Sequence, residues 1–355
     1  MNYLLNLFIE FLDKHNFNES IGIMIFSILP FAIIAAALVF VVLMLVYAER
    51  KILAYMTQRK GPNRVGPNGI LQTTADAIKL LCKENIELLH SDKVIFTIAP
   101  ILAFSSIVVL WCIIPYNAEF HLIDSTISLL FYVAVAGFPM LFHFLAGYAS
   151  NNKYSLLGSY RALSLTASYS VPILFTLLAT IFLADSMDLH KIIIAQEKVW
   201  FIIPNIIGFI VFFIASIAEL NRCPFDLSEA ESELVSGYHT EYSGMRFAMF
   251  FLGEYAALFV TAVFTAIIFF GGYQPPFGVY LSNILMGNCR CFNFLIYFEQ
   301  TFWLIAKSSI IIFLIIWIRG TLPRLTQKSV MNLFWRYLTP ISIINLILII
   351  LATRG

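Results

Sequence analysis

The sequence predicts an all-α integral membrane protein with about eight transmembrane helices and one amphipathic helix on the membrane surface. Of its 355 residues, 60% are hydrophobic and only 12% are charged. The 34 Phe outnumber the 22 Lys and Arg, so the chain has too few charged groups to cover a soluble surface. This composition excludes a soluble globular domain, a disordered chain, a collagen-like protein and a nucleic-acid-binding protein.

Long stretches without charged residues predict the individual spans, because crossing a bilayer takes about 20 mostly apolar residues. Charged residues mark the breaks between the stretches. Pro340 is expected to open or kink the last helix. The predicted spans are residues 21–48, 94–118, 125–152, 162–184, 199–218, 247–271, 295–318 and 337–353, in a single polytopic domain over residues 1–355.

Lys and Arg divide unequally between the two sets of loops that eight spans create. The loops 49–93, 150–161, 219–246 and 319–336 hold 16 Lys and Arg, whereas the opposite side holds five. Basic loops stay in the cytoplasm or, in mitochondria, in the matrix. We therefore expect both termini to lie on the opposite, periplasmic side.

The first basic loop begins with three charges, Glu49 to Lys51, directly against the first span. They could anchor the helix at the lipid headgroups, or they could belong to a functional site. The turn-rich stretch 61–69 lacks the Lys and hydroxyl of a phosphate-binding loop, so nucleotide binding is not expected. One helical face then collects Leu71, Ala75, Ile78 and Cys82, which predicts a helix on the membrane surface that could border an entrance from the lipid.

Six carboxylates lie between the fifth and sixth predicted spans. A solvated acidic loop is the simple explanation, but cytoplasmic loops normally gain Lys and Arg, and these acids alternate with apolar residues. Carboxylates held close together raise each other's pKa and can exchange protons near neutral pH, so proton or cation handling is an equal alternative. The six are Glu219, Asp226, Glu229, Glu231, Glu233 and Glu241.

Two ionisable residues lie inside predicted spans, Glu254 and Lys307. Charges within a bilayer are costly and usually face the interior of a helix bundle, where they pair or relay protons. A connection between Glu254 and Lys307 through water is therefore a hypothesis. His143, in the third span, is interpreted as an interior histidine with satisfied hydrogen bonds.

Four segments resemble one known family: Ala48 to Lys51, Gly61 to Pro67, Ser150 to Tyr154, and Glu219 to Glu241. From about Val42 to Pro340 the chain resembles the quinone-site membrane subunits of respiratory complex I, the proton-pumping NADH:quinone oxidoreductase. This family comprises the H subunit of the bacterial enzyme and the equivalent subunit 1 of the mitochondrial enzyme.

The resemblance implies an enzyme subunit that binds no cofactor or metal of its own. A quinone, ubiquinone by preference, would be the substrate, while FMN, NADH and the iron–sulfur clusters would belong to partner subunits. Those partners would be the peripheral quinone-site subunits and the antiporter-like membrane subunits, within membrane lipid and without nucleic acid. The expected location is a bacterial inner membrane, with the mitochondrial inner membrane as the alternative.

The resemblance also implies roles for individual residues, most of them in loops 49–93 and 219–246 and none of them catalytic. The expected quinone-chamber residues are Arg50, Arg59, Arg222, Phe225 and Asp226. The proton-relay residues that the resemblance implies are Glu219, Glu229, Glu231, Glu233, Glu241 and Glu254. Glu49 and Lys307 are added to the expected relay because they are charges at the end of one span and inside another.

The chain departs from the family pattern at two places. The family usually has a glutamate after a Ser-Tyr pair in the fourth span, whereas Ser168-Tyr169 is followed here by Ser170. Residues 282–300, with Cys289 and Cys291, resemble an insertion for which we have no functional account. The five Cys are an odd number without a Cys-x-x-Cys pair, so neither a disulfide framework nor an iron–sulfur ligand set is expected.

Three other functions fit parts of the sequence. Buried charges also occur in stand-alone ion-coupled transporters, although we find no internal repeat here. A related anchor subunit of a membrane-bound hydrogenase or of a plastid-type complex would receive electrons from a different donor. A purely structural anchor would not need six acids and two charges inside the membrane.

Overall fold

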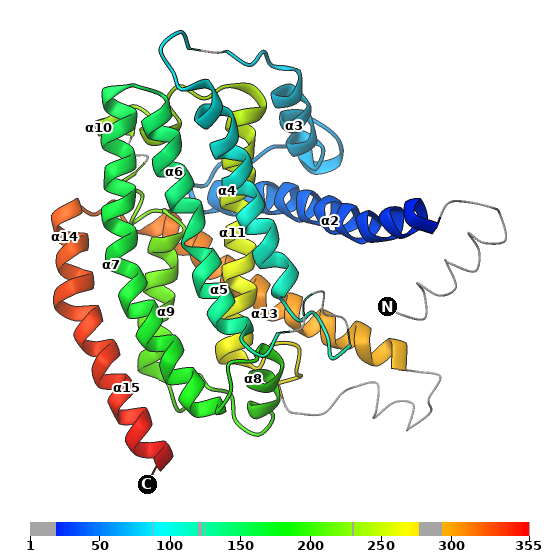
Figure 1. Cartoon of the computed structure of the whole chain (residues 1–355), viewed down its shortest axis with the longest axis vertical. Helices are drawn as coiled ribbons and strands as arrows, with labels where there is room; N and C mark the ends of the chain where they lie inside the picture. The colour runs from blue at the N-terminus through cyan, green and yellow to red at the C-terminus, as the bar shows by residue number, and fades with distance from the viewer. Residues whose placement is uncertain are drawn as a thin grey trace.

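The structure, a computed structural model, describes residues 19–86, 88–119, 123, 125–228, 231–276 and 293–354. All regular structure in these residues is helical (Figure 1). Six helical segments among them are long and apolar enough to cross a membrane. The predicted class, an all-α membrane protein, is therefore confirmed for the part of the chain that the structure describes.

Two further helices lie where the remaining spans are predicted, α2 (Glu19–Met56) and α9 (Ile206–Glu219). Helix α9 has only 14 residues, so eight crossings stay a prediction. The six longer segments are α4 (Lys93–Ile113), α5 with α6 (Ser128–Ala136 and Phe138–Ala149), α7 (Lys153–Ala184), α11 (Gly244–Phe270), α13 (Asn293–Thr321), and the succession α14 (Gln327–Asn332), π-helical η4 (Leu333–Leu338) and α15 (Thr339–Arg354).

The expected surface helix forms as α3 (Gln72–Cys82), which packs against α2 and α11. Its Ile78 and Leu81 side chains are exposed, as befits a helix that lies against lipid. The remaining short elements are η1 (Pro67–Gly69), α8 (Leu189–Ala195), α10 (Glu231–Leu234) and η2 (Gly237–His239).

Local side-chain chemistry moves several helix ends away from the predicted positions. Gly137 divides the third predicted span into α5 and α6, and Pro139 lies in the first turn of α6. Helix α9 starts at residue 206 because the Asn205 side chain accepts a hydrogen bond from the Gly208 amide at 3.1 Å. Asn345 of α15 donates to the same Asn205 oxygen at 2.8 Å, so this hydrogen bond holds the start of α9 against α15.

Helix α11 is the most buried of the six long segments and contacts α2, α4, α9 and α13. In Figure 1, α2 and α13 run obliquely to the upright helices α4, α6 and α7. Helices α3 and α10 lie at one end of the bundle, whereas α8 and the C-terminus lie at the other. Sites at the α3 end are therefore built on the N-terminal half of α11.

Lys307 of α13 binds the opposite, C-terminal end of α11. Its Nζ donates hydrogen bonds to the carbonyl oxygens of Phe270, Gly272 and Gln274 at 2.6, 2.9 and 2.6 Å, and it lies 4.7 Å from the centre of the Trp200 ring. Carbonyl groups at a helix C-terminus lack partners within the helix and form the negative end of its dipole. Lys307 therefore satisfies the end of α11.

This placement changes the expectation for Lys307 and Glu254. Glu254 precedes Phe270 by sixteen residues on α11, a distance of about 24 Å along the helix axis. The structure does not bring the two charges together, because the three carbonyl groups already provide partners for the ammonium group.

We expect Lys307→Met to destabilise the protein by roughly 3 kcal/mol, because the variant leaves buried carbonyl oxygens without their charged donor. The measurement is the fraction of detergent-extracted protein that remains folded as the temperature rises. Ser309→Ala is the matched control on the same helix, since this exposed hydroxyl donates to the Ile305 carbonyl oxygen of its own helix at 2.7 Å. A Lys307→Met variant as heat-stable as the control would contradict the role.

Candidate functional site

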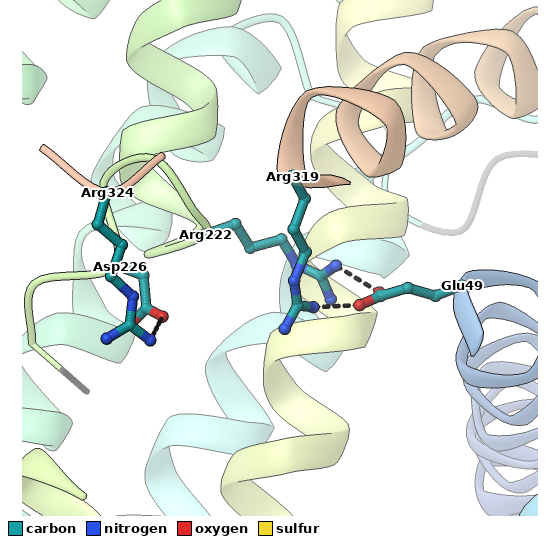
Figure 2. A network of polar contacts seen from close by, with 5 residues as sticks. All are labelled: Glu49, Arg222, Asp226, Arg319 and Arg324. Carbon is teal, nitrogen blue, oxygen red and sulfur yellow. Dashed lines mark hydrogen bonds and ion pairs between the residues drawn. The ribbon is translucent and has the colours of Figure 1, made fainter. Parts of the chain in front are cut away.

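A carboxylate shared by two arginines forms the centre of the candidate site (Figure 2). The Arg222 guanidinium donates to Oε2 of Glu49 at 2.5 Å, and Arg319 donates to Oε1 of the same carboxylate. Glu49 belongs to α2, Arg222 to the loop after α9, and Arg319 to the last turn of α13. One side chain therefore joins three segments that lie far apart in the sequence.

The Glu49–Arg222 pair is almost completely removed from solvent, with 4% and 6% of the two side chains exposed. The Arg222 guanidinium also lies 4.6 Å from the centre of the Tyr255 ring. Burial acts to lower the pKa of Arg222, but Glu49, Tyr255 and Glu254 outweigh it, so the pKa lies above its usual value. Arg222 therefore remains a fixed positive charge.

A cavity of about 170 Å³ adjoins these arginines, and Asp226 lines it. Arg324 donates to Oδ2 of Asp226 at 2.9 Å, as Figure 2 shows. His239 lines the same cavity, and burial lowers its pKa despite the opposing effect of Glu254 and Asp226, so the ring is neutral near pH 7. We call this space the charged cavity; it is lined by Asn221, Arg222, Cys223, Asp226, His239, Phe247, Phe250, Phe251, Glu254, Tyr255 and Arg319.

A second cavity of about 60 Å³ lies deeper among the helices, and we call it the inner cavity. Its lining includes the carboxylates of Glu219, at the end of α9, and Glu254, on α11. Asn221, Phe250 and Glu254 line both cavities, so they form the boundary between the two. The Tyr238 hydroxyl donates to Oε1 of Glu254 at 3.0 Å and holds this carboxylate at the boundary.

The position of Tyr238 depends on a close contact between two glycines. A Cβ atom on Gly158 of α7 would lie 2.8 Å from the Cα atom of Gly237, too close for any larger residue. Gly237 also has a φ of 62°, which glycine adopts without strain. Ser155 completes the contact by donating to the Tyr238 carbonyl oxygen at 3.0 Å.

An apolar groove of about 280 Å³ is lined by residues of α2, α3 and α11. Arg50 and Asp76 line it and form an ion pair at 2.5 Å, with 42% and 37% of their side chains exposed. Phe251 lines both this groove and the charged cavity. The groove is lined by Val39, Val42, Leu43, Val46, Arg50, Thr73, Asp76, Ala77, Leu80, Leu81, Met245, Ala248, Phe251 and Leu252.

Two of the expected quinone residues lie away from these spaces. Arg59 is exposed and lines a separate polar pocket together with Lys51 and Lys60. Phe225 is buried in the core, where its ring centre lies 5.7 Å from that of Phe334. Of the five expected residues, Arg222 and Asp226 share the charged cavity, and Arg50 lies in the groove beside it.

The other expected relay residues are spread over the end of the bundle that carries α10. Asn152 donates to Glu241 at 2.5 Å, and Arg161 forms an ion pair with the exposed Glu233. Glu231 begins α10, and Glu229 lies outside the described residues, as do positions 282–292 with Cys289 and Cys291. Ser170 is half-buried on α7, with its hydroxyl oxygen 3.5 Å from the Ala167 carbonyl oxygen.

Sequence reasoning missed several residues of the site. Arg319 and Arg324 were counted only as basic loop residues, and Tyr238 and Asn221 carried no signal that distinguished them from their neighbours. Their positions depend on how distant helices pack. Within the described residues, no group of three or more His, Cys, Asp or Glu side chains could hold a metal ion.

Known proteins resemble the chain over almost its whole length. A sequence model of the family described as NADH dehydrogenase matches residues 29–350. The NADH-quinone oxidoreductase H subunit of Brevibacillus brevis is 44% identical over 323 residues, which cover 89% of this chain and 91% of the relative. The H subunits of Bacillus cytotoxicus and Bacillus mycoides are 43% and 42% identical over 304 residues, which cover 85% of this chain and 86% of each relative. The chain therefore belongs to the NADH dehydrogenase family, in the group formed by the H subunits of NADH-quinone oxidoreductase.

Proposed function

We propose that this chain, a membrane subunit of the proton-translocating NADH-quinone oxidoreductase, admits the quinone and begins a proton path. One observation carries the proposal: the groove and the two cavities adjoin one another along α11, which lines them between Met245 and Thr261. Phe251 joins the groove to the charged cavity, and Glu254 joins the charged cavity to the inner cavity. A lipid-soluble substrate and a proton path thus meet at one helix.

The apolar groove fits the tail of a quinone, since its lining is almost entirely aliphatic and aromatic. It lies beside α3, whose exposed Ile78 and Leu81 suit contact with lipid. The Arg50–Asp76 ion pair supplies the polar contacts at the groove. A quinone would enter there with its headgroup toward Phe251 and the charged cavity.

The charged cavity suits the quinone headgroup or the protons that its reduction consumes. Reduction to quinol takes two electrons and two protons, and the electrons would come from iron–sulfur clusters on partner subunits. Arg222 and Arg319 offer positive charge where negative charge develops on the headgroup oxygens. Asp226 and His239 are titratable groups in the same cavity.

The carboxylates would carry protons from this cavity toward partner subunits in the membrane. Glu254 is the first carrier in this proposal because it lines both cavities, and Glu219 is the next. Glu231, Glu233 and Glu241 would act as carriers at the α10 end, and Glu229, outside the described residues, stays an expected carrier. Glu49 is held between two arginines, so it would set the field of the charged cavity, and Lys307 would serve α11 as a structural partner.

Arg50→Ala is expected to raise the KM for quinone about threefold while leaving kcat unchanged, because Arg50 would act in binding and not in the reduction itself. The change in KM is small because the ion pair between Arg50 and Asp76 is half-exposed and contributes little to the free energy of binding. The measurement is the steady-state rate against quinone concentration in membranes that hold the assembled enzyme. Lys79→Ala, on the same surface helix, is the control. An unchanged KM in Arg50→Ala would count against this entrance.

Glu254→Gln is expected to slow quinone reduction about tenfold or more, because the amide keeps the Tyr238 hydrogen bond but cannot carry a proton. The reaction of the flavin site with ferricyanide should stay at the wild-type rate and shows that the enzyme is assembled. Glu197→Gln, two residues after the end of α8, is the control. Full quinone reduction and full proton pumping in Glu254→Gln would refute the relay.

An azido-quinone should label this chain upon illumination within residues 49–83 or 219–241, and excess quinone should suppress the label. Peptide mapping of labelled membranes makes the test. If the label is confined to neighbouring subunits, this chain does not bind the quinone, and a proton-relay or anchoring role remains for it.

A further inference from the structure

His143 of α6 lies in the inner cavity with an unsatisfied ring nitrogen. Only 7% of the residue is exposed, and the imidazole stacks on the Tyr238 ring with 4.3 Å between ring centres. Phe250 meets its edge at 5.5 Å. Nδ1 is buried and has no hydrogen-bond partner among the described residues, contrary to the satisfied interior histidine that the sequence suggested.

Asn221 supplies a second unsatisfied atom in the same cavity. Its Oδ1 is buried without a hydrogen-bond partner among the described side chains and backbone groups, and its Nδ2 contacts the Met140 sulfur at 3.7 Å. Both Asn221 and His143 line the inner cavity together with Glu219 and Glu254. Buried polar atoms in native proteins are satisfied by water when protein partners are lacking.

The inner cavity has room for that water. Its volume of about 60 Å³ can be compared with the roughly 10–15 Å³ of such space that one water molecule needs. A short chain of water molecules therefore fits between the four polar side chains. Water alone would connect the carboxylates, but the imidazole adds a titratable group to the lining of the same cavity.

We propose that His143 passes protons between Glu254 and Glu219 through water held by its own Nδ1 and by Oδ1 of Asn221. The acid form of Glu254 releases its proton to the water, which protonates Nδ1. The imidazolium then releases the same proton from Nδ1 through water to the carboxylate of Glu219, which restores the starting tautomer of the ring. At the end Glu254 is a carboxylate, Glu219 is a carboxylic acid and His143 is neutral again, so proton and charge balance.

The geometry suits a histidine for this step. The two aromatic contacts fix the plane of the ring, so its nitrogens keep their directions while the charge changes. The other titratable side chains that face the cavity are Tyr132 and Tyr169, and Tyr238 already donates to Glu254. The inference rests on the relay proposed above and assigns it an additional carrier.

Two variants in the assembled enzyme separate carrying a proton from holding water. His143→Phe keeps a flat ring against Tyr238 and removes both nitrogens, whereas His143→Gln keeps hydrogen-bonding groups that do not titrate. We expect both to lower quinone-linked proton pumping about tenfold or more, with ferricyanide reduction at the flavin site unchanged as the measure of assembly. Asn221→Leu should lower pumping as well, because it removes the second anchor of the water chain.

Wild-type pumping in His143→Phe would overturn the proposal, and so would wild-type pumping in His143→Gln, which would reduce His143 to a holder of water. A high-resolution map of the assembled enzyme should show water within hydrogen-bond distance of Nδ1 of His143; a dry cavity would also overturn the proposal. Glu254→Gln separates this inference from the proposed function. If Glu254→Gln abolishes pumping while His143→Phe does not, only the added carrier fails, whereas full pumping in both refutes the relay itself.

Discussion

The site depends on the single carboxylate of Glu49, which holds two arginines from distant parts of the chain. A buried charge is tolerated only with a partner, and removal of Glu49 would leave Arg222 and Arg319 facing each other with like charge. The two ion pairs of Glu49 therefore determine how the end of α13 and the loop after α9 pack against α2. The wall of the charged cavity follows from this contact, because both arginines line it and Tyr255 packs on one of them.

The fold was largely predictable because lipid imposes a simple rule on sequence. Charge-free stretches of about 20 residues correspond to helices, and an apolar face at helical spacing corresponds to α3. The helix ends were not predictable from hydropathy. The side chain of Asn205 caps the start of α9, and Gly137 interrupts a continuous apolar stretch. Neither residue is charged, so neither marks a helix end in a prediction based on charged residues.

The site was only partly predictable, because a list of ionisable residues does not say which of them meet. The acidic loop drew attention to Glu219 and Asp226, and the charge within a span drew attention to Glu254. Their partners come from packing: Arg324 donates to Asp226 and Tyr238 donates to Glu254, and no pattern in the sequence pairs these residues. Glu254 and Lys307, opposite charges in neighbouring spans, do not meet: Glu254 lies in the N-terminal half of α11, whereas Lys307 binds its C-terminal end.

The contact between Lys307 and the end of α11 has a consequence for biogenesis. A lysine at the centre of a span opposes insertion by about 2.5–3.5 kcal/mol when the helix enters lipid alone. Helix α11 precedes α13 in the chain, so the carbonyl groups that bind Lys307 are synthesised before it. Insertion of α13 is therefore easiest as a hairpin with α11, before either helix is released into the bilayer. The order of synthesis thus matches the order in which the buried charge and its partners are needed.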